Sequence, residues 1–308
     1  MSNDVYNKVN LTFNNLIDKD MVDFVVYRLS GGEPLLVFDQ WKPFIEEFMS
    51  TNRDKKFVSL ISNMTILTDE MIEFFIEYNI GFGLSLDGYS YSKPFISKKS
   101  SAEIVRNNID RLINCGITKN IDISTVIDSK SFDDLDILAE WIAERDLNWG
   151  IYLDHFFCGE IDSNLIIQKM VKVIDILYSH KYDVYNKLKF NNIKITKQYD
   201  GCTAGEKLLA IDTDGGIYPC QTAIYDTPIS NIMTAKNIIA DLKNQKTYKL
   251  GYNIETPEAC NKCPIFDLCG GGCKMHNKEI NKNFTCDIMK TVILYMMKTV
   301  IKRGCINA

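Results

Sequence analysis

The sequence predicts an α/β protein in which a parallel sheet is followed by a small cysteine-rich domain. Three observations indicate this: short apolar segments alternate with amphipathic ones, polar residues follow each apolar segment, and cysteines concentrate in the last third of the chain. Strands that alternate with helices form βα units, whose parallel sheet is either open or closed into a barrel. With 308 residues, the chain is long enough for one large domain, a smaller one and a buried core.

The alternation runs from about residue 24 to residue 157. Apolar stretches of strand length are separated by segments with a helical period, and Thr68 and Gly116 mark a helix start and a helix end. We expect strands at 24–29, 57–61, 81–86, 121–127 and 149–153. We expect helices between them at 37–49, 69–78, 102–114 and 132–145, and later helices at 164–179 and 287–303.

The chain divides into three predicted parts. Residues 1–157 hold the alternating strands and helices, and residues 158–200 form a helical connector. Residues 201–308 contain short strands, glycine-rich turns, the cysteines and a C-terminal helix.

Composition favours a soluble, cytosolic protein. The net charge is −5 and no run of Lys or Arg stands out, so we expect no nucleic-acid partner. The N-terminus lacks the pattern of a signal peptide, and the apolar run at 292–297 is far too short to span a bilayer, so we expect no membrane partner. In the cytosol clustered cysteines bind metal more often than they form disulfides.

Polar residues follow four successive predicted strands. Ligands of parallel α/β sheets bind at the carboxyl ends of the strands. Gly, Ser, Asn and Asp are also ordinary turn residues, but four polar ends in a row favour a shared ligand site. The polar ends are Ser30-Gly31-Gly32-Glu33-Pro34, Ser62-Asn63, Ser85 with Asp87-Gly88, and Ser124-Thr125.

Seven of the ten cysteines form one spaced constellation in the C-terminal third. Within it, four cysteines follow the spacing C-x2-C-x5-C-x3-C. Thiolates this close bind a soft metal or an iron–sulfur cluster, or they form disulfides; tetrahedral zinc is a competing occupant. The seven are Cys202, Cys220, Cys260, Cys263, Cys269, Cys273 and Cys286.

Together, the Gly-Gly-Glu-Pro strand end and the cysteine spacing resemble the radical S-adenosylmethionine (SAM) enzymes with a C-terminal SPASM domain, which modify peptides and proteins. The resemblance implies a partial (β/α) barrel of the radical SAM type, with its first strand missing, over residues 1–157, and a SPASM iron–sulfur domain over 201–308. By the resemblance, the methionine moiety of SAM binds at Gly31, Gly32, Glu33 and Pro34. Later strand ends would contact SAM through Asn63, Ser85 and Thr125.

In that family the seven cysteines bind two auxiliary [4Fe–4S] clusters. Gly215, between Cys202 and Cys220, also matches the family pattern. By position, the first cluster would be held by Cys202, Cys220 and Cys273, leaving an iron open to a substrate thiolate, a water or a carboxylate such as Asp200. The second cluster would be held by Cys260, Cys263, Cys269 and Cys286.

Two features depart from the family pattern. The C-x3-C-x2-C motif of the catalytic cluster should precede the Gly-Gly-Glu-Pro strand, yet no cysteine precedes Cys115. We therefore expect that the chain as given cannot cleave SAM, and that it is an N-terminally truncated form or, alternatively, a degenerate relative. In sulfatase-maturing members an aspartate follows the second cysteine of the pattern, where this chain has Gln221.

These features lead us to expect an oxygen-sensitive, cytosolic protein that modifies a peptide or protein, with ribosomal peptide maturation favoured. Its cofactors would be SAM and two auxiliary [4Fe–4S] clusters, and its reductant a ferredoxin or flavodoxin. One alternative is a non-catalytic iron–sulfur or zinc protein that holds a peptide for a partner. The other is a sulfatase-maturase-like enzyme, which Gln221 makes the weaker choice.

Overall fold

The computed structural model describes residues 1–91, 101–153, 161–191, 193–196, 203–205, 207–235, 238, 260, 262–271 and 282–303. The chain folds into two compact units. The first unit contains Met1–Val25, Asp39–Lys56 and Tyr199–Ile280. The second unit contains Val26–Phe38, Phe57–Gln198 and Asn281–Ala308.

A six-stranded sheet, with strands in the order β1-β2-β3-β4-β5-β6, forms the centre of the second unit. Neighbouring strands from β2 to β6 pair in parallel, which confirms the predicted α/β class. The strands are β1 (Val25–Leu29), β2 (Lys56–Ser62), β3 (Gly81–Ser85), β4 (Ile121–Val126), β5 (Asn148–Tyr152) and β6 (Leu188–Phe190). The first five lie within two residues of the predicted strands, whereas β6 lies in the segment that we expected to be a helical connector.

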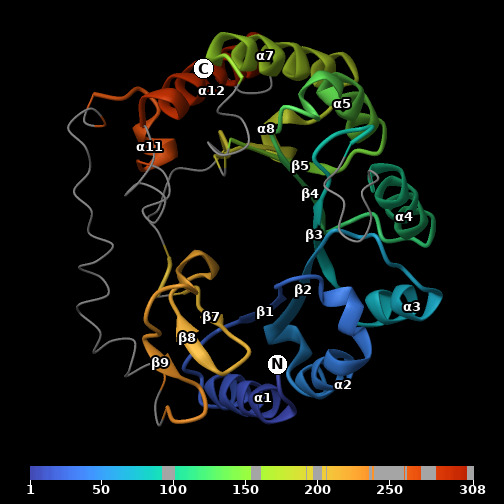
Figure 1. Ribbon diagram of the computed structural model, residues 1–308, viewed down its shortest axis with the longest axis vertical. Helices are drawn as coiled ribbons and strands as arrows, with labels where there is room; N and C mark the ends of the chain where they lie inside the picture. Colours follow the sequence, from blue (N-terminus) through green and yellow to red (C-terminus); the bar gives the residue numbers. More distant parts are fainter. Residues whose placement is uncertain are drawn as a thin grey trace. The chain divides into compact units, whose positions relative to one another are not determined.

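Helices cover one side of this sheet. In Figure 1, α3, α4, α5 and α7 lie along the same side of β2 to β5, as expected for βα units that wind in one direction. The Thr68 hydroxyl accepts a hydrogen bond from the amide of Met71 at 3.2 Å and caps α3, and Gly116, with φ 90°, follows α4. The helices of this unit are η1 (Pro34–Val37), α3 (Asp69–Glu77), α4 (Ala102–Asn114), η3 (Phe132–Asp134), α5 (Leu135–Glu144), α7 (Ser163–Ser179), α8 (Val184–Lys187) and α12 (Lys282–Lys302).

The last helices of the second unit are joined by polar side chains. The Tyr295 hydroxyl on α12 donates to the Asp175 carboxylate on α7 at 2.7 Å. The Tyr182 hydroxyl, which is buried, donates to the carbonyl of Leu147 at 2.6 Å. Burial raises the pKa of Tyr182 well above its ordinary value, because the phenolate would lose its hydration. Tyr182 therefore stays neutral and contributes a hydrogen bond beside β5.

The first unit combines N-terminal helices with a small antiparallel sheet, β7-β8-β9. The buried amide of Asn10 on α1 donates to the carbonyl of Phe44 at 2.8 Å, and the rings of Tyr6 and Phe44 stack 4.6 Å apart. These contacts fix α1 against α2. The elements are α1 (Asn3–Asp18), most of α2 (Phe38–Phe48), η2 (Arg53–Lys55), β7 (Ala210–Ile211), β8 (Gly216–Tyr218), η4 (Gln221–Ala223), β9 (Ser230–Asn231) and α11 (Phe266–Cys269).

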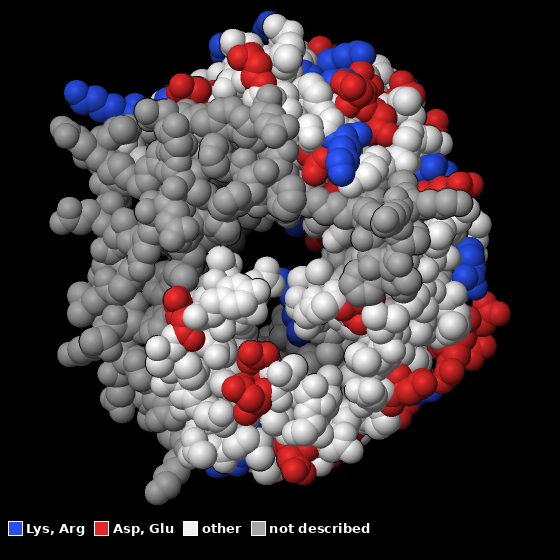
Figure 2. Space-filling view, in the orientation of Figure 1, with Lys and Arg blue, Asp and Glu red and all other residues white. Residues whose placement is uncertain are grey.

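The solvent side of α3 is acidic. Asp69, Glu70, Glu73 and Glu77 are all exposed, while Phe75 on the opposite side is buried. Figure 2 shows acidic side chains gathered over this helix. In the residues that the structure describes, no helix is both long enough and apolar enough to cross a bilayer.

Candidate functional site

The loop that follows β1 carries the Gly-Gly-Glu-Pro sequence at the carboxyl end of its strand. Gly31 and Gly32 are exposed, and Gly31 has φ 147°, a conformation that side chains disfavour. A Cβ atom built on either glycine would meet no described atom within 4 Å. A ligand can therefore approach the backbone of this loop closely, which is the condition that a backbone-bound SAM requires.

Glu33 holds this loop against the end of β2. Its side chain is buried, and one carboxylate oxygen accepts hydrogen bonds from the Leu35 amide at 3.1 Å and the Ser62 hydroxyl at 2.7 Å. The other oxygen accepts a hydrogen bond from the Asn63 amide at 2.8 Å. The carboxylate thus bonds to the protein, and the predicted contact between Glu33 and SAM stays a prediction. Pro34, also buried, begins η1 directly after it.

Two further predicted contacts, Asn63 and Ser85, are half-exposed at neighbouring strand ends. The Asn63 side-chain oxygen accepts hydrogen bonds from the amide of Thr65 at 3.0 Å and from its hydroxyl at 2.7 Å. This turn fixes the side chain and leaves its amide group without a partner in the described part of the chain. Ser85 lies opposite Ser124 in the register of β3 and β4.

Side chains of the central strands alternate between two faces of the sheet. In β4, buried and half-exposed positions alternate along the whole strand, as a period of two requires. The register carries the same alternation to the neighbouring strands. We call one side the open face: Ser59, Ile61, Gly83, Ser85, Asp122, Ser124, Gly150, Tyr152 and Lys189. We call the other the covered face: Leu60, Phe82, Leu84, Ile121, Ile123, Thr125, Trp149, Ile151, Leu188 and Phe190.

Thr125 lies on the covered face. Its side chain is fully buried, and its hydroxyl donates to the carbonyl of Leu86 at 2.6 Å. The same hydroxyl accepts a hydrogen bond from the indole of Trp149 at 2.8 Å. Thr125 thus joins β3, β4 and β5, and a ligand that touched its hydroxyl would have to displace one of these bonds. The predicted contact between Thr125 and SAM stays a prediction.

The open face also carries charged and aromatic residues that we did not predict as site residues. The Lys189 ammonium lies 3.3 Å from the Asp122 carboxylate, and the two half-exposed side chains reach across β5. On β5, Gly150 lies opposite Lys189, and a Cβ built on Gly150 would lie 2.8 Å from the Tyr152 hydroxyl, so the Tyr152 side chain covers this glycine. These residues occupy alternate positions of their strands. Assigning alternate residues of each predicted strand to one face would therefore have placed them together from the sequence.

Five of the predicted cysteine ligands are described, and three of them, Cys220, Cys260 and Cys263, carry free thiols. Cys220 precedes η4 and Cys269 ends α11, and the amide of Cys263 donates to the carbonyl of Cys260 at 3.0 Å. Cys286 is exposed on α12, in the second unit. The remaining two, Cys202 and Cys273, lie outside the described residues.

The cysteine ligand sets stay a prediction. Among the His, Cys, Asp and Glu side chains of the described ranges, no three stand close enough to hold a metal ion. The donor chemistry suits iron or zinc, since thiolates are soft ligands, but the geometry of these residues does not by itself build a centre. In the hairpin between β7 and β8, Gly215 has φ 87°, and a Cβ there would lie 3.0 Å from the Ile232 side chain. Gln221 is exposed in η4.

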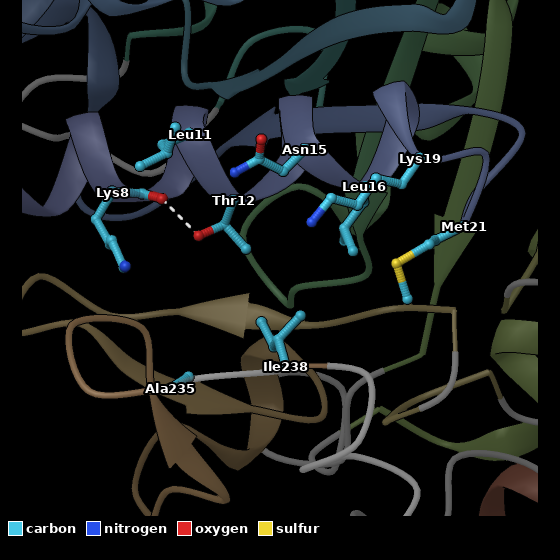
Figure 3. A pocket seen from close by; sticks show the side chains of 9 residues that line it. All are labelled: Lys8, Leu11, Thr12, Asn15, Leu16, Lys19, Met21, Ala235 and Ile238. Atoms are coloured by element: carbon cyan, nitrogen blue, oxygen red, sulfur yellow. Dashed lines mark hydrogen bonds between the residues drawn. The ribbon is translucent and has the colours of Figure 1, made fainter.

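A separate cavity of about 200 Å³ lies within the first unit (Figure 3). One wall is α1, where the Thr12 hydroxyl donates to the carbonyl of Lys8 at 2.7 Å. Among the described residues of its lining there is no Cys, His, Asp or Glu, and its charged groups are the ammonium groups of Lys8 and Lys19. The lining residues are Lys8, Leu11, Thr12, Asn15, Leu16, Lys19, Met21, Ala235 and Ile238.

The chain is similar to known proteins of one family. A sequence model of the Radical SAM superfamily matches residues 17–142. A cysteine-type anaerobic sulfatase-maturating enzyme of Clostridium perfringens (strain 13 / Type A) is 23% identical, covering 89% of this chain and 82% of that protein. The radical SAM cyclopropyl synthase TigE of Paramaledivibacter caminithermalis is 20% identical, covering 85% of this chain and 58% of that protein.

Solved structures share the fold. Native anSMEcpe with bound AdoMet superimposes with a TM-score of 0.80 at 16% identity, covering all of this chain and 90% of the other. The same protein with bound AdoMet and a peptide gives a TM-score of 0.76 at 17% identity, with coverages of 98% and 90%. The family match includes the Gly-Gly-Glu-Pro loop and the ends of β2, β3 and β4. Residues 17–142 therefore match the Radical SAM superfamily, and the solved structures share the fold of the chain.

Proposed function

We propose that the chain binds SAM along the carboxyl ends of β1 to β4 and that it acts in the modification of a peptide or protein. The observation that carries this proposal is the loop at Gly31 and Gly32, whose backbone is open while Glu33 holds its base. When SAM is bound and reductively cleaved, it supplies a 5′-deoxyadenosyl radical that can abstract a hydrogen atom from a substrate. Radical SAM chemistry belongs to the cofactor, and the protein contributes binding and orientation.

Each part of the strand edge has its own role in this proposal. Exposed backbone groups of Gly31 and Gly32 bind the amino-acid end of SAM, because no side chain keeps the ligand away. Glu33 and Pro34 fix the loop, and the free amide group of Asn63 and the hydroxyl of Ser85 offer polar contacts along the edge. Asp122, Lys189 and Tyr152 lie on the open face beside β5, where a substrate side chain could bind.

For the cysteine-rich part we propose two auxiliary [4Fe–4S] clusters, the first on Cys202, Cys220 and Cys273. The second would use Cys260, Cys263, Cys269 and Cys286. The support is the spacing of the seven cysteines along the chain. A ferredoxin or flavodoxin in the cytoplasm would supply electrons. Zinc bound to the same thiols is the competing assignment, and it would make the chain a non-catalytic holder of peptides.

The catalytic cluster needs thiolates of its own. The 308 residues contain no cysteine before Cys115, so the three-cysteine motif is not among the residues near Gly31. We propose that these residues alone bind SAM without cleaving it, and that cleavage requires a segment with three further thiolates. A C-x3-C-x2-C pattern encoded just upstream of Met1 would favour a piece of a longer enzyme, and its absence would favour a degenerate relative.

Two substrate classes remain in view. Maturation of a ribosomal peptide is supported by Gln221, which is exposed where sulfatase-maturing members have an aspartate. Sulfatase maturation is supported by the names of three relatives, each 23% identical to this chain. Replacing Gln221 by Asp, in a chain that also carries a segment with three further thiolates, separates the two: turnover of a sulfatase peptide by the Asp variant alone would favour sulfatase maturation.

The test of SAM binding uses two glycines as a matched pair. Gly31 and Gly116 both have positive φ, and both have open space around the missing Cβ. Alanine at either position introduces similar backbone strain, but only Gly31 lies at the strand edge. We expect equilibrium dialysis under anaerobic conditions to show SAM binding that Gly31→Ala weakens at least tenfold and Gly116→Ala leaves unchanged. Equal effects of the two variants would contradict the proposed site.

The cluster proposal has its own measurement. After anaerobic reconstitution with iron and sulfide, two clusters would give about eight irons per chain and no zinc. Replacing Cys263 by Ser should reduce the iron content by about half, whereas replacing Cys115 by Ser should not change it. Retention of zinc with little iron would contradict the cluster assignment and support the peptide-holding alternative.

A further inference from the structure

The cavity in the first unit combines apolar side chains with two cations. Its walls are α1 and the residues that follow β9, and both belong to the same unit. In Figure 3, the Lys8 side chain points from α1 toward the wall that carries Ala235 and Ile238. Lys19, at the C-terminal end of α1, is the other charged residue of the described lining. A ligand in this cavity therefore meets positive charge at two places.

Both lysines are available to an anion from outside the chain. Within the described residues, neither ammonium group makes an ion pair or a hydrogen bond. The Asp18 carboxylate accepts a hydrogen bond from the Asn52 side chain at 2.9 Å. The Asp20 carboxylate pairs with the Lys55 ammonium at 3.0 Å. These neighbouring carboxylates bond elsewhere, so the cavity keeps its positive charge.

The spacing of the two lysines indicates the size of the ligand. Three turns of α-helix separate Lys8 from Lys19, so the two residues lie on one face about 16 Å apart along the axis. Leu11 and Met21, which also line the cavity, are 56% and 45% exposed. A small anion would pair with one ammonium group and leave the apolar side chains uncovered. An extended peptide spans the same distance with about five residues.

Polar groups beside the apolar side chains suit a peptide backbone. Asn15 is exposed, and its side-chain amide has no hydrogen-bond partner in the described part of the chain. The Thr12 hydroxyl donates to the carbonyl of Lys8 at 2.7 Å, which leaves its oxygen able to accept a further bond. Amide side chains both donate and accept, as the groups of a peptide backbone require. The lining thus offers partners to the backbone as well as to the side chains of a peptide.

We propose that this cavity binds an acidic, apolar peptide segment, in which two carboxylates lie about five residues apart with apolar side chains between them. Lys8 and Lys19 pair with the carboxylates, and Leu11 and Met21 contact the apolar side chains. The segment belongs to the peptide or protein that the chain modifies and lies away from the reacting bond. In that respect the inference rests on the proposed function, but the residues that bind the segment are separate from the proposed SAM site.

The test measures peptide binding in the absence of SAM. The probe is a fluorescein-labelled peptide with two glutamates five positions apart and alternating leucine and alanine between them, and its anisotropy is measured at low salt. We expect the double variant Lys8→Gln with Lys19→Gln to weaken binding about tenfold, because two exposed ion pairs are lost. The control, Lys119→Gln with Lys298→Gln, changes the net charge equally at exposed positions of the second unit and should bind normally.

A second matched pair tests the apolar part of the lining. Leu11→Gln should weaken peptide binding about threefold, whereas Ile104→Gln, at a similarly exposed position of α4, should not change it. Lys19 also lies where a cation stabilises the end of its helix, so melting temperatures are measured by circular dichroism for every variant. Lys8→Gln alone, which is inside the helix, should weaken binding about threefold at an unchanged melting temperature.

Two results would overturn the inference. One is an equal loss of binding in the two double variants, and the other is equal binding of a probe with lysines in place of the glutamates. SAM binding, measured by anaerobic equilibrium dialysis, separates this inference from the proposed function. If the chain binds SAM but not the acidic peptide, only this inference fails. If it binds the peptide but not SAM, the proposed function fails and the peptide site stands.

Discussion

The open face and the covered face of the same sheet use polar residues in different ways. On the open face, the Ser85 and Ser124 hydroxyls have no partner in the described part of the chain, and the Asp122–Lys189 pair is half-exposed. Behind the strand ends, the buried side chains of Glu33 and Thr125 bond to several groups each. Polar groups that are buried must be paired, whereas polar groups at a ligand site must be left available.

The difference shows how a small change in position changes the role of a residue. Ser124 and Thr125 are neighbours in sequence and have the same functional group, yet a strand period of two sends them to opposite faces. The covered face gives the strand ends fixed positions, and the open face can then present groups at fixed spacings. This is the arrangement by which binding sites are made rigid before the ligand arrives.

The largest effect that tests this comparison is expected from Glu33→Gln. Glutamine places an NH₂ group where a carboxylate oxygen now accepts a hydrogen bond, so a buried donor is left facing a donor. We expect a loss of about 2–3 kcal/mol in the free energy of unfolding, measured by urea denaturation. Glu73→Gln, at an exposed position of α3, is the control and should cost less than about 0.5 kcal/mol. Similar losses for both variants would show that Glu33 is not a structural link.

A somewhat smaller effect is expected from Gly88→Ala, beyond the end of β3. A Cβ at this position would lie 2.6 Å from the Asp134 carboxylate and 2.7 Å from the Cβ of Ser131. Overpacking of this kind costs about 1–3 kcal/mol. Gly32→Ala, which meets no described atom within 4 Å, is the matched variant and should leave the urea midpoint nearly unchanged. Equal midpoints for the two variants would mean that the loop after β3 adjusts freely.

Hydrophobic periodicity was sufficient to predict most of the sheet. Five strands and the helices between them follow from runs such as 121–127, because buried strands and amphipathic helices have different repeats. The sixth strand, Leu188–Phe190, was missed since three residues are too few to show a period. The helix cap at Thr68 was predicted correctly because capping depends on local sequence.

The roles of the site residues were harder to predict than their positions. The sequence indicated polar strand ends, but the period of two becomes ambiguous at a strand end, so the sequence alone did not show that Thr125 is buried while Ser124 is half-exposed. The three bonds of Glu33 reach residues 29 and 30 positions away as well as its own loop, and no local pattern encodes such contacts. The cysteine spacing predicts the chemistry of the ligands but not how the chain brings them together.

A moderate effect, dependent on pH, is expected from Tyr182→Phe. The buried hydroxyl donates to the carbonyl of Leu147, so its removal should cost about 1 kcal/mol at pH 8. Burial raises the pKa of Tyr182 in the folded state, so this residue's stabilising contribution is present below the unfolded pKa near 10 and is lost as the pH rises above it. Between pH 8 and pH 11, the urea midpoint of the unsubstituted chain should therefore decrease more than the urea midpoint of Tyr182→Phe. A parallel fall in both would contradict the raised pKa.

The smallest effect on stability is expected from Lys189→Met, on the open face. The Lys189–Asp122 pair is partly exposed, with side-chain exposures of 29% and 47%, and ion pairs of this kind contribute about 0.5 kcal/mol or less. Removing a hydrogen-bond partner on the covered face should cost more, because a buried polar group there cannot bond to water instead. Urea denaturation of Lys189→Met, Asp122→Asn and the double variant measures the coupling directly. A coupling energy well above 1 kcal/mol would show that this pair is a structural link, as Glu33 and Thr125 are. A small coupling energy would mean that both charges are available to a substrate on the open face.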